Sequence, residues 1–73
     1  MDKKEDALLK LGRRLTELRQ KQQLSVDELA TRAGIDVREI GGIEAGEVDP
    51  PLTTLFALSH VLGIPPHQLV SDL

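Results

Sequence analysis

Apolar residues recur at intervals of three and four along the first third of the chain, at Leu8, Leu11, Leu15 and Leu18. This spacing gathers the side chains on one face of a helix, which we predict from about Glu5 to Gln22. Gly12 falls on the same face, where a missing side chain lets another helix approach closely. The charged residues 1–4 that precede the helix are expected to fray.

A second helix is predicted to begin at Val26, because Ser25 and Glu28 have the spacing of a capping box. In that arrangement the serine hydroxyl accepts from the Glu28 backbone N–H, and the glutamate side chain accepts from the serine N–H. Gly34 ends the helix, since glycine readily takes the left-handed conformation after a last turn. The inner face of this helix is expected to hold Leu29, Ala30 and Ala33.

A third helix follows after two residues, capped by Asp36 with Glu39 at the capping-box position. It is predicted to span residues 37–44 and to bury Ile40 and Ile43. A turn this tight makes the second and third helices cross at a steep angle. The second helix then supports the third, which projects from the surface. The projecting helix has the width to enter a DNA major groove. The spacing of these residues alone does not distinguish a helix-turn-helix from other pairs of helices joined by a tight turn.

A fourth helix is predicted over residues 52–62, and a short fifth helix begins at Pro65-Pro66, where proline suits the first turn. The inward residues of these two helices are expected to be Leu55, Leu58, Leu62, Leu69 and Val70. Five helices joined by short turns leave no segment for a sheet. The predicted fold class is therefore all-α, a compact five-helix domain formed by residues 1–73.

The distribution of charge matters more than the net charge of −3. Residues 1–38 contain all nine Lys and Arg with seven acids, which gives +2, whereas residues 39–73 contain five acids and neither Lys nor Arg, which gives −5. Neutralisation of phosphates supplies much of the affinity of proteins for DNA. Any DNA-facing surface is therefore expected mainly from the first half of the chain.

Catalysis and cofactor binding find no support in the sequence. The chain has no cysteine, and His60 and His67 lack the spacing of a metal site. There is no glycine-rich phosphate loop and little room for a pocket. The apolar runs are too short to cross a bilayer, and no signal peptide precedes the helices. We expect a cytoplasmic protein that is not an enzyme, with no cofactor, metal, membrane or evident small-molecule ligand.

Several spaced motifs agree with one known family. They are residues 24–30 (LSVDELA), 33–35 (AGI), 43–46 (IEAG) and 61–64 (VLGI), with Ile40, Pro50 and Leu55 between them. In these positions the chain resembles the Cro/phage-repressor (XRE-type) helix-turn-helix family, over about residues 11–69. The Gly41-Gly42 pair resembles that of the restriction–modification controller proteins in this family.

The resemblance implies a bacterial or phage transcriptional regulator that binds a palindromic operator as a dimer, with its third helix in the major groove. The fourth and fifth helices and the loop between them are the implied dimer interface. The resemblance also implies an ion pair between Arg19 and Glu44, which fixes orientation more than it adds stability, because desolvation offsets the attraction. Independent solvation of the two side chains is the alternative.

The chain departs from the family at positions that often touch DNA. Val26 stands where a glutamine usually meets phosphate, Ala45 where Arg or Asn is usual, and residues 47–49 (EVD) where the loop is often basic. Two carboxylates near a phosphate backbone repel it. This loop is therefore not expected to clamp phosphate.

The candidates for base contact lie in the third helix. Arg38 either donates two bonds to guanine or pairs with a carboxylate such as Asp36 or Glu39. Val37 either touches a thymine methyl group or is partly buried by packing. Glu39 either accepts from cytosine or completes the helix cap.

Gly41 and Gly42 each cost the third helix about 1 kcal/mol in propensity. They have no side chain with which to contact a base, so we expect Gly42 to let backbone approach DNA or a neighbouring helix. A defect that packing tolerates is the alternative.

Phosphate contacts are expected mainly from the second helix. Backbone N–H groups at its start, beside Ser25 and Val26, suit phosphate because the helix dipole favours negative charge there. The side chains expected to add contacts are Thr31, Arg32, Lys21 and Arg14. Each is equally compatible with an ordinary solvated surface position.

Phe56 lies off the apolar stripe of the fourth helix, and Leu9 lies opposite that of the first. Exposed apolar side chains mark interfaces, although single ones are common. We expect Phe56 in a homodimer interface. Two functions stay open: a DNA-binding regulator, and a protein-interaction module that keeps the fold with weak or no DNA binding. The helix-turn-helix motif favours the regulator, whereas the missing phosphate contacts and Phe56 favour the interaction module.

Overall fold

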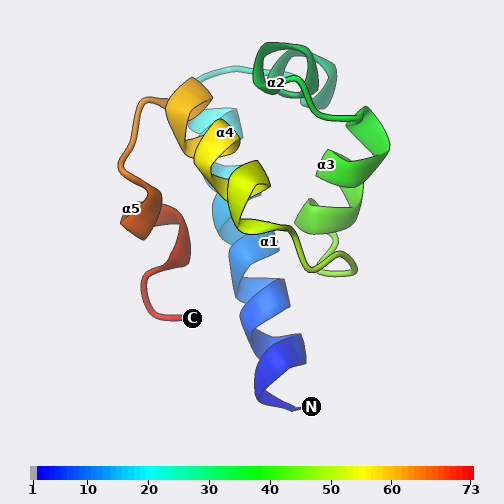
Figure 1. Ribbon diagram of the computed structural model, residues 1–73, viewed down its shortest axis with the longest axis vertical. Helices are drawn as coiled ribbons and strands as arrows, with labels where there is room; N and C mark the ends of the chain where they lie inside the picture. The colour runs from blue at the N-terminus through cyan, green and yellow to red at the C-terminus, as the bar shows by residue number, and fades with distance from the viewer. Residues whose placement is uncertain (1) are drawn as a thin grey trace.

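The computed structural model describes residues 2–73, and these form five helices and no strand. The helices are α1 (Lys3–Lys21), α2 (Val26–Ala33), α3 (Val37–Glu44), α4 (Leu52–Leu62) and α5 (Pro66–Val70). The long α1 runs through the middle of the molecule, with α3 on one side, α5 on the other and α2 near its C-terminal end (Figure 1). The predicted all-α, five-helix fold is confirmed.

The first helix begins earlier than the leucine spacing predicted. Asp2 accepts a hydrogen bond from the Glu5 backbone N–H at 2.7 Å and so caps α1. Lys3 and Lys4, which were expected to fray, are its first helical residues. Met1 lies outside the described residues. Apolar periodicity did not reveal this start, because no apolar residue of the stripe lies in the first turn.

One core joins the inner faces of all five helices. Its buried apolar residues are Leu11, Leu15, Leu24, Leu29, Ala30, Ile40, Ile43, Leu58, Leu62 and Leu69. Helix α1 packs against α3 and α5, α4 packs against α2 and α5, and α2 packs against α3. Since α2 and α3 have only eight residues each, they are too short to be stable alone, and this packing holds them. None of the helices in residues 2–73 has the length and apolarity needed to cross a membrane.

The short helix α5 differs from the prediction at one residue. Leu69 is fully buried, as expected, but Val70 is 40% exposed. A helix of five residues makes little more than one turn, so adjacent positions cannot both face the core. Arg14 of α1 fastens the chain that follows α5. Its Nη1 donates to the carbonyl oxygens of Leu69, at 3.2 Å, and Ser71.

The turn between α2 and α3 depends on a left-handed glycine. Gly34 has a φ of +70°, and this left-handed conformation ends α2 and changes the direction of the chain. The next N–H, of Ile35, donates to the Ala30 carbonyl oxygen at 3.0 Å, and the Ile35 side chain packs against the core. Helix α3 starts two residues later, which gives the predicted tight connection between the two helices.

Candidate nucleic-acid interface

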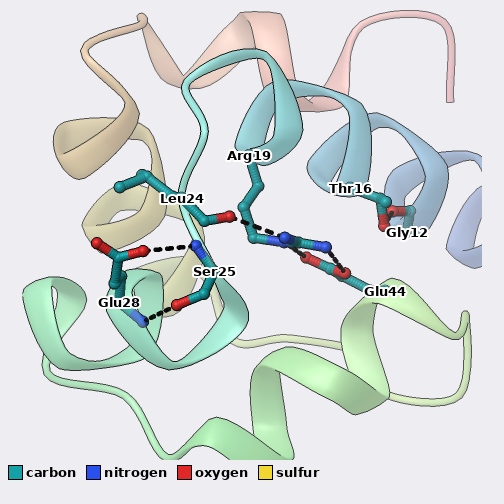
Figure 2. A network of polar contacts seen from close by, with 7 residues as sticks. All are labelled: Gly12, Thr16, Arg19, Leu24, Ser25, Glu28 and Glu44. Atoms are coloured by element: carbon teal, nitrogen blue, oxygen red, sulfur yellow. Dashed lines mark hydrogen bonds and ion pairs between the residues drawn. The ribbon is translucent and has the colours of Figure 1, made fainter.

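The start of α2 is fixed by two reciprocal hydrogen bonds. The Ser25 Oγ accepts from the Glu28 backbone N–H at 3.0 Å, and the Glu28 Oε1 accepts from the Ser25 N–H at 2.9 Å (Figure 2). This is the predicted capping box. The bonds from Ser25 lower the pKa of the Glu28 carboxyl, because they stabilise its charged form. Both residues are exposed, so the capped turn faces solvent.

Helix α3 is seated on the core by its inner face and by a close approach of α1. Ile40 and Ile43 are 0% and 1% exposed. A Cβ atom at Gly12 would lie 2.5 Å from the Ile43 carbonyl oxygen and 2.6 Å from that of Glu44. The close approach expected at Gly12 is therefore made by the end of α3, and it sets how deeply that helix sits.

The predicted partners Arg19 and Glu44 form an ion pair in the structure. Arg19 Nε lies 2.7 Å from Glu44 Oε2, and Nη2 lies 3.1 Å from Oε1, while Nη1 donates to the Leu24 carbonyl oxygen at 2.9 Å (Figure 2). Both side chains are only 12% exposed. The hydrogen bond that Arg19 donates to Glu44 raises the pKa of Arg19. One guanidinium thus joins α1, the segment before α2 and the end of α3.

The outer face of α3 begins with two exposed side chains, Val37 and Arg38. Val37 is 40% exposed, so its side chain is accessible from the outer face of the helix. The Arg38 side chain is 89% exposed and pairs with Asp36, with Nη2 and Oδ2 separated by 3.0 Å. This contact lowers the pKa of the Asp36 carboxyl and raises the pKa of Arg38, mainly through the hydrogen bond between the side chains. Arg38 is therefore both paired and accessible.

Glu39 does not complete the cap of α3, as the capping-box spacing had predicted. Asp36 accepts from the Arg38 backbone N–H at 2.8 Å, while the Glu39 carboxylate accepts from the Thr54 hydroxyl at 3.2 Å. Glu39 is turned toward α4, which the sequence did not place nearby. The residue therefore links two helices.

Gly42 has a neighbour within the same chain. A Cβ atom there would collide with the Val48 side chain, and the Gly42 carbonyl oxygen accepts from the N–H groups of Glu47 and Val48. The group that lies against Gly42 is thus the following loop, and not a neighbouring helix as one of the two expectations had it. Gly41, in contrast, is exposed and has open space where its side chain would be, so it is the glycine on the outer surface.

The predicted phosphate-binding residues divide into two groups. Exposed side chains belong to Ser25, Thr31, Arg32 and Lys21. Val26 packs partly buried against the core, so only its backbone is suited to phosphate. Arg14 is only partly exposed, and its Nη1 donates to the carbonyl oxygens at the end of α5.

Two surface features were not found by sequence reasoning. Lys4 lies 3.6 Å from Asp49 and offsets part of the negative charge of the loop after α3. Leu52 is 64% exposed and precedes the 48% exposed Phe56 by one helical turn on α4. The spacing of four between Leu52 and Phe56 indicates that they share one face of the helix, so the sequence could have revealed this pair. Nothing local in the sequence linked Lys4 to Asp49.

A capped helix that braces a second helix, whose first turn projects a valine and an arginine, defines a helix-turn-helix domain. The sequence model of the family described as Helix-turn-helix matches residues 15–69. The chain belongs to this family, as its motifs had indicated.

A curated relative and three solved structures are similar to the chain. The HTH-type transcriptional regulator DdrOP3 of Deinococcus deserti is 39% identical over 62 residues, which cover 85% of this chain and 48% of that protein. The chain thus spans about half the length of this relative. The restriction-modification controller protein C.AhdI of Aeromonas hydrophila has a TM-score of 0.83 at 39% identity, over 85% of this chain and 94% of that one.

The other two structures extend the likeness of fold. An HTH_3 family transcriptional regulator from Vibrio cholerae has a TM-score of 0.87 at 25% identity, over 94% of this chain and 39% of that one. The hypothetical transcription factor NHTF from Neisseria has a TM-score of 0.85 over 96% of this chain and 80% of that one. Its identity of 21% shows the fold alone.

Proposed function

We propose that this chain is a sequence-specific DNA-binding transcriptional regulator that places the start of α3 in the major groove. The contrast between the two faces of α3 supports this most. Ile40 and Ile43 are sealed in the core, whereas Val37 and Arg38 project from the first turn. A helix braced in this way presents its N-terminal residues to base edges. The regulator names of the relatives agree with binding rather than catalysis.

The proposed contacts divide between bases and phosphates. Arg38 donates to guanine and Val37 contacts a thymine methyl group. Phosphates are held by the backbone N–H groups at the start of α2. The side chains proposed to assist there are Ser25, Thr31, Arg32 and Lys21. These contacts fix register without reading sequence, so discrimination rests on the first turn of α3.

We also infer that two copies bind a palindromic operator in the bacterial cytoplasm. Leu52 and Phe56 place two apolar side chains on one exposed stretch of α4, and a homodimer would remove them from water. Two-fold symmetry would then set the recognition helices about 34 Å apart, one turn of DNA. This repeat matches the two halves of a palindrome.

The test is a titration of the chain against a pool of random duplexes at rising salt. We expect the logarithm of the association constant to fall linearly with the logarithm of salt concentration. Arg32→Ala and Lys21→Ala should each reduce the slope by about one, because each removes one phosphate contact. Lys10→Ala is the matched control, since Lys10 pairs with Asp6 on α1, and it should leave the slope unchanged.

A protein-interaction module with weak or no DNA binding is the second candidate. The exposed Leu52 and Phe56 favour it, as do the carboxylates of Glu47 and Asp49 next to α3. This candidate gives negligible binding to every duplex even at low salt. That outcome would reject the regulator proposal.

A further inference from the structure

Asp36 holds Arg38 at two places, on the backbone and on the guanidinium. Its Oδ1 accepts from the Arg38 backbone N–H at 2.8 Å and from Nε at 3.3 Å, and its Oδ2 accepts from Nη2 at 3.0 Å. The backbone bond also caps α3. The carboxylate is therefore anchored to the helix, and it restrains a guanidinium that is otherwise in solvent.

The pair uses only one edge of the guanidinium. This group has five N–H donors in a planar fork, and Asp36 occupies the side edge formed by Nε and Nη2. The contacts with Asp36 involve Nε and Nη2, which leaves the N–H groups of the end edge, formed by Nη1 and the second N–H of Nη2, for another acceptor. Guanine presents two acceptors, N7 and O6, that a bidentate arginine meets. One guanidinium can therefore bind Asp36 and a guanine at the same time.

Within α3 no other side chain can replace Arg38 as a donor. The helix reads VREIGGIE, and Arg38 is its only side chain with a hydrogen-bond donor at neutral pH. Glu39, the other nearby carboxylate of the helix, is engaged by Thr54 of α4. The orientation of a single guanidinium, set by Asp36, thus decides most of what this surface can read by hydrogen bonds.

We propose that Asp36 is a positioning residue for base recognition, which holds the side edge of Arg38 so that the end edge faces guanine. The inference rests on the proposed DNA-binding function. A restrained arginine loses less conformational freedom when it binds. The carboxylate also repels phosphate, so Asp36 lowers the affinity for every duplex while it sharpens the preference for one base pair.

The test compares Asp36→Ser with the unaltered chain. Serine remains a good helix cap but is too short to reach the guanidinium. Duplexes are selected from a random pool by the unaltered chain, and the position at which Arg38→Ala loses its preference identifies the base pair that Arg38 reads. At that position Asp36→Ser should discriminate about tenfold less well. It should bind mismatched duplexes at least as tightly as the unaltered chain does.

Asp27→Ser is the matched control, because it removes an exposed carboxylate from the first turn of α2. It makes the same change in charge and should alter affinity without altering base preference. Thermal unfolding verifies that each variant is folded. If Asp36→Ser unfolds too readily, Asp36→Asn retains the cap, and its neutral amide should cause a smaller loss of discrimination at the same position.

The outcomes separate the two proposals. If a folded Asp36→Ser variant retains the full preference, the positioning role is wrong although the chain binds DNA. The same holds if preference falls at many positions at once, because a displaced helix would explain that result. If the unaltered chain selects no duplex at low salt, the DNA-binding function fails, and the role of Asp36 fails with it.

Discussion

Three carboxylates around the helix-turn-helix have different tasks, set by what surrounds each of them. Glu28 closes an exposed capping box with Ser25. Asp36 caps α3 and restrains Arg38. Glu44 receives two hydrogen bonds from Arg19 where both side chains are 12% exposed. Only the last pair is largely removed from water, so we expect only its loss to be strongly destabilising.

Stability should depend on pH through Glu28. The folded pKa of Glu28 lies below its unfolded value near 4.5, so its stabilising effect is fully present above that value and is lost as pH falls through the folded pKa. Glu28→Gln cannot titrate. The difference in Tm between this variant and the unaltered chain should therefore shrink below about pH 4.

Thermal unfolding followed by circular dichroism between neutral and acid pH makes this comparison. In a Ser25→Ala background, which itself costs about 1 kcal/mol, the effect of Glu28→Gln should keep most of its dependence on pH, because the backbone N–H of residue 25 still donates to Glu28 Oε1. A difference in Tm that is constant over the whole range in the unaltered background would refute the assignment.

Removal of one partner of the Arg19–Glu44 pair should strongly destabilise the folded chain. Arg19→Met leaves a largely buried carboxylate without its partner, and we expect a loss of about 3 kcal/mol in the free energy of unfolding. Arg19→Met combined with Glu44→Met should lose less than the sum of the two single variants, because neither charge is left alone. Urea unfolding measures all four proteins, and additive losses would show that the pair is not coupled.

At the scale of helices, the position of α3 depends on a contact between two backbones, made possible by a glycine. The backbones of α1 and α3 meet at Gly12, and the capping interactions at Ser25 and Asp36 start α2 and α3 at defined residues. Neither eight-residue helix would persist alone. The arrangement of the helix-turn-helix therefore depends on packing against α1 as much as on the turn between α2 and α3.

Two glycine-to-alanine changes should have opposite effects. Gly12→Ala places a methyl group 2.5 Å from the Ile43 carbonyl oxygen, so α1 and α3 must separate, at a cost of about 1–3 kcal/mol. Gly41→Ala meets open space in an exposed part of α3 and should stabilise the chain by up to about 1 kcal/mol. Urea unfolding of both variants tests the close approach, which is disproved if Gly12→Ala is harmless.

At the scale of the whole molecule, charge and apolar surface are divided unequally. Lys and Arg occur only in residues 1–38, whereas the exposed apolar pair of α4, Leu52 and Phe56, lies in the acidic second half. A single chain would therefore present a basic region for DNA and a separate region for a second copy. This division is consistent with the proposed dimer, in which each surface has one task.

Phe56→Ser should shift the chain toward monomer and weaken operator binding more than tenfold, because a dimer gains from both half-sites. Sedimentation velocity measures the mass, and the duplex titration measures the affinity. Val37→Ser is the control for the mass, since it introduces the same polar group at another exposed position and should leave the mass unchanged, and Lys10→Ala is the control for the affinity. A Phe56→Ser variant with unaltered mass and affinity would exclude this surface as the dimer interface.

The starts and ends of the helices could be predicted because their signals are local. Serine, aspartate and glycine act within three or four residues, and leucine periodicity needs no distant partner. The limits of α2, α3 and α4 were predicted as they stand in the structure. The start of α1, its end at Lys21 rather than Gln22, the role of Glu39 in the cap of α3 and the burial of Val70 differed.

The candidate site was less accessible to such reasoning. Glu39 meets Thr54, Gly42 lies under Val48, and Arg14 binds the end of α5. Each of these contacts joins segments that are distant in sequence or separated by a loop. No local pattern gives their relative positions.

By itself the sequence determined which residues form helices and which side of each helix is apolar, because backbone preference and hydrophobic burial act on neighbours along the chain. Only the tertiary structure decided which polar side chains remain accessible. A guanidinium is available to a partner when no carboxylate or carbonyl of another helix reaches it. The Arg14 Nη1 donates to the Leu69 carbonyl oxygen of α5, whereas Arg38 pairs only with Asp36, two residues away in sequence, and its side chain is 89% exposed.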